Sequence, residues 1–182
     1  METLKKYFEP ILIVTLSVLI FLTIYNLSLL QGTARVINYA GIVRGATQRE
    51  VKLEIAGVPS EKLISELDGI IEGLQHGGSQ YQLVKLDDLQ YQEDQQKLAA
   101  YWLDLKEEIR KSRQIGYANT DLLHMSETYF HLADQMVSDA EVYSQKLANR
   151  LELLEIGMVL NVAALLGVLL LYHFQSVRLR KK

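Results

Sequence analysis

Two long apolar runs bracket this sequence, at residues 10–30 and 156–174, and about 125 mostly polar residues lie between them. As helices, runs of this length reach about 28 to 31 Å, which matches the hydrocarbon core of a bilayer. The first run is longer than the apolar part of a cleaved signal peptide, and no Ala-x-Ala-like site follows Leu30. The pattern therefore predicts two transmembrane helices, 10–30 and 156–174.

Basic residues flank both apolar runs on their outer sides. Lys5 and Lys6 precede the first run, and four basic residues follow the second within 178–182. Because such residues concentrate on the cytoplasmic side of a membrane, we expect residues 1–9 and 175–182 in the cytoplasm. Residues 31–155 are then extracytoplasmic, and the protein is expected in an inner or plasma membrane.

Helical periodicity dominates the segment between the runs. Apolar residues recur there at spacings of three and four, whereas the alternation typical of strands never lasts beyond four or five residues. The predicted helices continue from the first span to Ala56, then run from Glu61 to Leu74, from about Asp88 to Ile115, and from Thr120 through the second span, with a loop at 79–86. Ser60 and Thr120 are predicted N-caps, and Gly116 a C-cap. The predicted fold class is all-α: an antiparallel four-helix bundle whose first and last helices are continuous with two transmembrane helices.

The same periodicity predicts which side chains of the last two helices face the core. In the third helix these are Leu98, Tyr101, Trp102, Leu105 and Ile109. In the fourth they are Leu122, Met125, Tyr129, Leu132, Met136, Tyr143 and Leu147.

Charge and composition exclude several classes of function. Residues 31–155 carry 20 acidic and 13 basic residues, and an acidic domain argues against nucleic acid as a partner. The chain has no cysteine, which excludes disulfides and thiolate chemistry. His76, His124 and His131 are spaced too far apart for a metal site, and no nucleophile–base pair or phosphate loop is present. We therefore expect no catalysis, no metal and no cofactor.

The segment from Arg35 to Arg49 holds the candidate binding site. On a helix, Arg44 falls in the middle of a stripe of small and apolar residues, with Gly41 one turn earlier leaving a notch. A buried guanidinium needs a counter-charge, which leaves two alternatives open. If Leu30 and Glu155 both lie at the outer membrane surface, Arg44 faces Glu141, or Asp134 or Asp139 within a turn or two, in an internal ion pair; otherwise it receives an anion. The stripe comprises Ile37, Ala40, Gly41, Gln48, Val51 and Ile55.

A second packable stripe lies on the opposite side of this helix. A helix with two packable sides can face its own bundle with one and a second subunit with the other. The second stripe therefore predicts a homodimer, and its members are Tyr39, Ile42, Ala46, Arg49 and Leu53.

Residues 38–49 resemble the sensor domain shared by nitrate/nitrite-responsive histidine kinases and type IV pili methyl-accepting chemotaxis transducers. The first outer helix of that family carries Asn-x-Ala-Gly-x-x-Arg, usually continuing toward Ser/Thr-Gln-Arg. The resemblance implies that Arg44 binds an anion at a homodimer interface beside Gly41, and it makes Asn38 and Gln48 further ligand-binding candidates. A Gly45–Ala46 pair replaces larger residues of the family and widens the notch, so the ligand's identity is not carried over. The matching residues are Asn38, Ala40, Gly41, Arg44, Thr47, Gln48 and Arg49.

These patterns predict the ligand-sensing input module of a bacterial transmembrane receptor of the chemotaxis or two-component type. We expect three partners: a small-molecule ligand, for which an anion is the first candidate, the membrane, and a second copy of the chain. The alternative is a membrane-anchored structural or adaptor bundle that recruits another protein and binds no small molecule. Because the sequence ends at Lys182, we expect either an excised input half or a stand-alone sensor.

Overall fold

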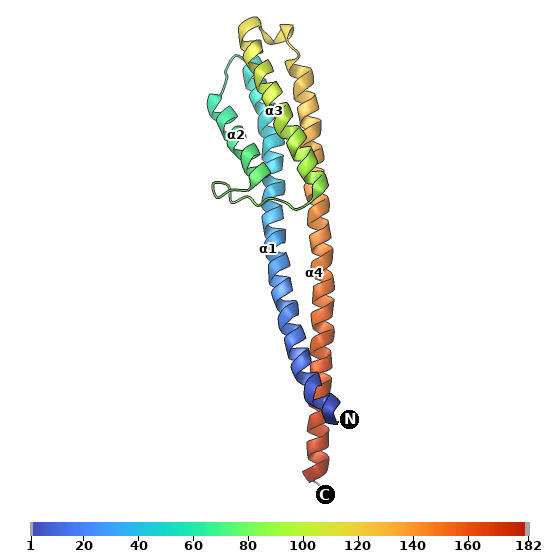
Figure 1. Cartoon of the computed structure of the whole chain (residues 1–182). Coiled ribbons are helices and arrows are strands. Elements are labelled where there is room, and N and C mark those ends of the chain that lie inside the picture. Colours follow the sequence, from blue (N-terminus) through green and yellow to red (C-terminus); the bar gives the residue numbers. More distant parts are fainter. Residues whose placement is uncertain (1, 181–182) are drawn as a thin grey trace. The chain divides into compact units, whose positions relative to one another are not determined.

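Four α-helices and one short 3-10 helix make up the structure, a computed structural model that describes residues 2–180 and the side chains of 7–175, 177 and 178. The elements are α1 (Glu2–Ile55), α2 (Glu61–His76), α3 (Leu89–Ile115), the 3-10 helix η1 (Tyr117–Asn119) and α4 (Leu122–Arg180) (Figure 1). Within residues 2–180 the only extended pairing is an isolated bridge between Gly78 and Leu83, in the predicted loop. The all-α prediction is confirmed. The basic residues Lys181 and Lys182 lie outside the described residues.

The chain forms two compact units. One, the outer unit, comprises residues 31–145, and the other, the span unit, comprises residues 1–30 and 146–182. Helices α1 and α4 contribute to both, while α2 and α3 belong to the outer unit alone.

Side-chain contacts show that neighbouring helices of the outer unit are antiparallel. Between α1 and α4, Arg44 meets Asp134 and Gln48 meets Ser126. Between α3 and α4, Trp102 stacks on Tyr129 at 5.7 Å between ring centroids. From Arg44 to Gln48 the residue number rises along α1, while that of the contacted residue falls along α4. The same holds for α2 and α3, where Asp68 contacts Trp102 and Ile71 contacts Gln95.

The core of the outer unit is apolar and built from all four helices. Trp102 and Tyr129 are its largest buried side chains together with Tyr91. The predicted inner positions hold: Leu98, Trp102, Leu105, Ile109, Leu122, Tyr129 and Met136 are buried, and Tyr101, Met125, Leu132 and Tyr143 are partly buried. Leu147, which was also predicted to face inward, is buried in the span unit.

Helix ends follow the predicted caps with one exception. The Ser60 hydroxyl accepts a hydrogen bond from the Leu63 N–H at the start of α2, and Gly116 ends α3 at φ +81°, a conformation that glycine adopts without strain. Thr120 does not cap α4. Its hydroxyl donates to the Tyr117 carbonyl and closes η1, so that α4 begins only at Leu122.

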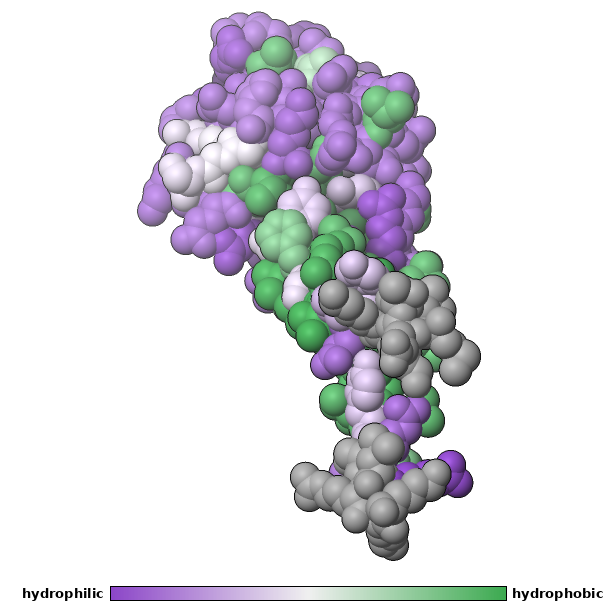
Figure 2. All heavy atoms as spheres, turned by 60° about the horizontal axis from the view of Figure 1, so that its bottom comes forward, coloured by the Kyte–Doolittle hydropathy of each residue, from purple (hydrophilic) through white to green (hydrophobic). Residues whose placement is uncertain are grey.

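The span unit presents the most apolar surface of the chain. The most apolar 18-residue windows of α1 and α4 have mean hydropathies of 2.2 and 2.3, and 0% and 6% of their residues are buried. Within this unit Thr23 donates a hydrogen bond to the Met158 sulfur, and Gly157 lies against Leu19. Hydrophobic residues cover much of this unit's surface in Figure 2, whereas hydrophilic residues cover most of the outer unit. Such exposed apolar helices fit a membrane protein.

Candidate functional site

Arg44 joins α1 to α4 through its guanidinium. Nη1 forms an ion pair with Asp134 of α4, and the centre of the guanidinium lies 5.8 Å from the ring centroid of Phe130 on the same helix. The side chains of Arg44 and Asp134 are 35% and 56% exposed. Because solvent screens a pair this exposed, it is worth about 0–1 kcal/mol. The guanidinium is thus paired, but loosely and within reach of water.

The expectation that Arg44 sits at the middle of a buried stripe is wrong. The buried line of α1 passes instead through Val36, Ala40, Val43 and Thr47, which places Arg44 at its edge. Small and apolar residues occur on more than one side of this helix, so the sequence pattern does not fix which side is innermost.

The internal partner of Arg44 is Asp134 and not Glu141, which is exposed. The difference is seven residues, or about two turns of α4. Asp134 is one of the two aspartates that the sequence placed within a turn or two of Glu141.

Gln48 also reaches α4. Its side-chain amide donates to the Ser126 carbonyl at 2.9 Å and to the Ser126 hydroxyl at 3.0 Å. Because this amide already has two acceptors within the chain, Gln48 acts in the described structure as a tie between α1 and α4.

Gly41 and Asn38 lie on the outward surface of α1. A Cβ atom at Gly41 or at Gly45 would meet no atom within 4 Å, and Asn38 is exposed. The glycines therefore leave open surface beside Arg44 and are not needed for packing within one copy of the chain.

The second predicted stripe of α1 is only partly exposed. Ile42 and Arg49 are exposed, but Tyr39 packs on Tyr81 at 5.2 Å between ring centroids, and Ala46 and Leu53 are partly buried. The open face is therefore rotated from the prediction. It consists of Ala34, Asn38, Ile42, Gly45, Arg49 and Lys52, with Gly41 at its margin, and is called the open face of α1 below.

Two groups of buried carboxyls were missed by sequence reasoning. Glu50 is 0% exposed in the core of the bundle; its position three residues after Thr47 and seven after Val43, on the same side of the helix, could have revealed this. Asp94 of α3, which is 5% exposed, and Asp139 of α4, which is partly buried, interact as a pair of neighbouring carboxyls, and the sequence offers no local signal for this pair.

The pKa values of Asp94 and Asp139 are shifted in opposite directions. Burial, together with the neighbouring charge of Asp94, raises the pKa of Asp139 to about 6. Burial also acts to raise the pKa of Asp94, but hydrogen bonds from Lys97, Asp139 and Gln90 outweigh it and lower that pKa. Asp94 therefore stays ionised while Asp139 holds a proton in mildly acidic solution.

The structure does not bring the histidines into a metal site. In the part of the chain that it describes, no three His, Cys, Asp or Glu side chains are grouped to hold a metal ion.

Comparisons with known proteins yield one informative likeness. No family model matches the chain, and no curated protein matches its sequence. Among solved structures, the ligand-binding domain of the nitrate receptor McpN from P. aeruginosa superposes with a TM-score of 0.51 at 17% sequence identity, over 60% of this chain and 96% of that one. At this identity the likeness shows a shared fold: the chain contains a helical bundle built like that ligand-binding domain.

Proposed function

We propose that this protein is the input module of a bacterial transmembrane signalling receptor, and that it binds a small anion at Arg44 between two copies of the chain. The observation that carries the proposal is the setting of Arg44: a partly exposed guanidinium beside the open surface at Gly41 and Gly45, held by an exposed carboxylate and the ring of Phe130. Two things support it, the motif around Arg44 and the likeness to a domain whose name is that of a nitrate receptor.

The chemistry of Arg44 suits this role. A guanidinium is always charged and offers planar, multidentate donors to an oxyanion. If two copies meet through the open face of α1, their Arg44 side chains repel each other until an anion lies between them. The anion must also displace Asp134, because one guanidinium edge is occupied by that carboxylate in the isolated chain.

Helix α1 offers a direct route for the signal. It runs without interruption from Glu2 to Ile55, so that it contains both Arg44 and the first predicted span. Drawing two α1 helices together at Arg44 would pass inward as a small shift or rotation. This scheme places residues 31–155 outside the inner or plasma membrane and both termini in the cytoplasm.

One observation favours the adaptor alternative. Arg44 already has a counter-charge within its own chain, as a structural ion pair would require. In that case α1 and α4 are tied permanently, and the open face of α1 recruits a partner protein without a small ligand.

Calorimetric titration of the full-length protein in lipid nanodiscs separates the two functions. The panel is nitrate, nitrite, sulfate, phosphate and acetate at constant ionic strength, since screening changes the strength of exposed charge interactions. We expect one class of anion to bind, Arg44→Ala to abolish the heat, and Arg110→Ala to leave it unchanged. Arg110 is the matched control because it is an exposed arginine of the outer unit that lies on α3, away from the open face of α1. Binding that survives Arg44→Ala, or no binding by any anion, would refute the proposal.

A further inference from the structure

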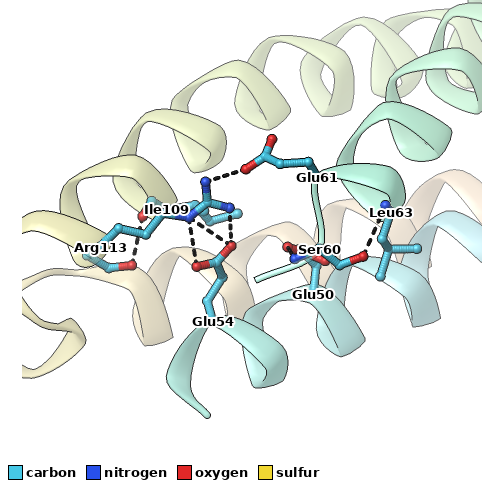
Figure 3. A network of polar contacts seen from close by, with 8 residues as sticks. Glu50, Glu54, Ser60, Glu61, Leu63, Ile109 and Arg113 are labelled. Atoms are coloured by element: carbon cyan, nitrogen blue, oxygen red, sulfur yellow. Dashed lines mark hydrogen bonds and ion pairs between the residues drawn. The ribbon is translucent and has the colours of Figure 1, made fainter. Parts of the chain in front are cut away.

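Glu50 is a buried acid that lacks a full set of partners. It lies in the last two turns of α1 and is 0% exposed. Its Oε1 accepts a hydrogen bond from the Ser60 N–H at 3.3 Å, while its Oε2 is buried and has no hydrogen-bond partner among the described residues. Figure 3 shows this carboxyl beneath the corner between α1 and α2. An ionised carboxylate left in this state would cost several kcal/mol.

The nearest cation does not neutralise Glu50. Arg113 of α3 donates through Nε to both carboxylate oxygens of Glu54, at 3.1 and 2.9 Å, and its two terminal nitrogens bind Glu54 and Glu61 (Figure 3). The Glu54 side chain is 2% exposed, so this ion pair is itself well shielded. Three carboxyls thus lie around the Arg113 guanidinium, but its donors bind those of Glu54 and Glu61 and not that of Glu50.

Among the residues that the structure describes, the elements around Glu50 bring it no second cation besides Arg113. Helix α2 contributes the Ser60 N–H and the carboxylate of Glu61, and α3 contributes Arg113. Helix α4 contributes the phenol of Tyr129, which lies beside Thr47, and Thr47 is one turn before Glu50 on α1. Burial raises the pKa of this phenol above its usual range, so it stays neutral. Glu54, on α1 itself, adds a like charge.

We infer that the Glu50 carboxyl, with Glu54 beside it, is a proton-binding site, so that the outer unit takes protons as a second ligand independently of Arg44. With the proton bound, Glu50 can donate to Glu54 and no buried charge is left unpaired. Once the proton is lost, two adjacent carboxylates share the field of Arg113 and repel each other. The strain falls on the corner at residues 56–60, where Ser60 both holds Glu50 and caps α2.

The affinity of the site lies in the physiological range. Burial, and then the hydrogen bond with and charge of Glu54, raise the pKa of Glu50 to about 7, against the opposing effects of the Ser60 N–H and Arg113. The folded chain therefore binds this proton more tightly than the unfolded chain, whose carboxyl has the ordinary value of 4.5. The contribution of Glu50 to the stability of the fold is therefore greatest below pH 4.5 and is lost as the pH rises through 7.

The first test is the pH dependence of unfolding, followed by fluorescence of Trp102, the single tryptophan, which is buried in the outer unit. In the full-length protein in nanodiscs, loss of this proton should raise the unfolding constant by up to about 80-fold between pH 4.5 and 7. Glu50→Gln should remove that rise, because an amide cannot ionise. Glu61→Gln is the matched control. It changes an exposed carboxylate of the same cluster and should keep the wild-type profile.

A second test uses only the wild-type protein and therefore does not depend on whether a variant folds. Infrared spectroscopy of the wild-type protein labelled with ¹³C-glutamate should show a protonated glutamate band that disappears with a midpoint near pH 7, separate from any unlabelled aspartate band. Absence of a glutamate band between pH 5 and 8 would overturn the inference. So would a Glu50→Gln variant that keeps both the band and the wild-type pH profile.

Discussion

The pairing of Arg44 with Asp134 leads to a quantitative prediction for ligand affinity. In the isolated chain the carboxylate of Asp134 occupies the guanidinium that the proposed anion would bind. Asp134→Asn keeps the size and polarity of the side chain and removes its charge. The anion then no longer has to displace an internal competitor, and we expect tighter binding.

The size of the gain follows from the exposure of the pair. With side chains 35% and 56% exposed, the ion pair is strongly screened and contributes roughly 0.2–1 kcal/mol. Removing the competitor should therefore lower Kd by a factor of about 1.4 to 5. Stability should fall by no more than about 1 kcal/mol, because Phe130 continues to pack beneath the guanidinium.

Calorimetric titration with the tightest anion of the panel measures this change, with Glu141→Gln as the control. Glu141 lies two turns away on the same helix and is exposed, so its removal changes net charge equally. Affinity gains of the same size in both variants would show a long-range charge effect and refute competition by Asp134. Weaker binding by Asp134→Asn would refute it too, since Asp134 would then help to hold the ligand.

Two further predictions concern stability of the outer unit. Leu105 is 0% exposed in the core, so Leu105→Ala should lower the free energy of unfolding by about 2–5 kcal/mol, measured by denaturant titration; a loss below about 1 kcal/mol would contradict this packing. Asp139 holds its proton more tightly in the folded chain, since its pKa rises from 3.8 to about 6, and stability should fall as the pH rises through that window. Asp139→Asn, whose amide can donate to Asp94, should be more stable than wild type at pH 7 by up to about 3 kcal/mol, and equal stability of the two proteins at pH 5 and 7 would contradict the shared proton.

Helices and caps were predictable because their causes are local. Apolar spacing of three and four set the helices, and Ser60 and Gly116 marked ends that the structure confirms. The prediction that Thr120 caps α4 failed because its hydroxyl binds the Tyr117 carbonyl of η1 instead. The sequence does not show which of two such local hydrogen bonds a threonine will form.

The relative placement of helices was not predictable, because it depends on contacts between distant segments. Counting residues from the expected membrane surface placed Arg44 opposite Glu141, two turns from its partner Asp134. The buried line of α1 lies roughly 80° around the helix axis from the predicted stripe, so that Arg44 is at its edge and not at its middle. The same difference brings Glu50 inward, so its unusual chemistry became visible only with the neighbouring helices in place.

Cysteine crosslinking along the open face of α1 tests whether two copies meet there and respond to an anion, since the chain has no cysteine of its own. Single cysteines at Asn38, Ile42 and Gly45 would be oxidised in native membranes with and without the bound anion, with Leu123, exposed on α4, as the control position. We expect crosslinks between copies at the α1 positions, and we expect their yield to change when the anion is added. This change should vanish with Arg44→Ala. A crosslinking yield that does not change with the anion, or that is no greater than the yield at Leu123, would contradict a ligand-driven interface at Arg44.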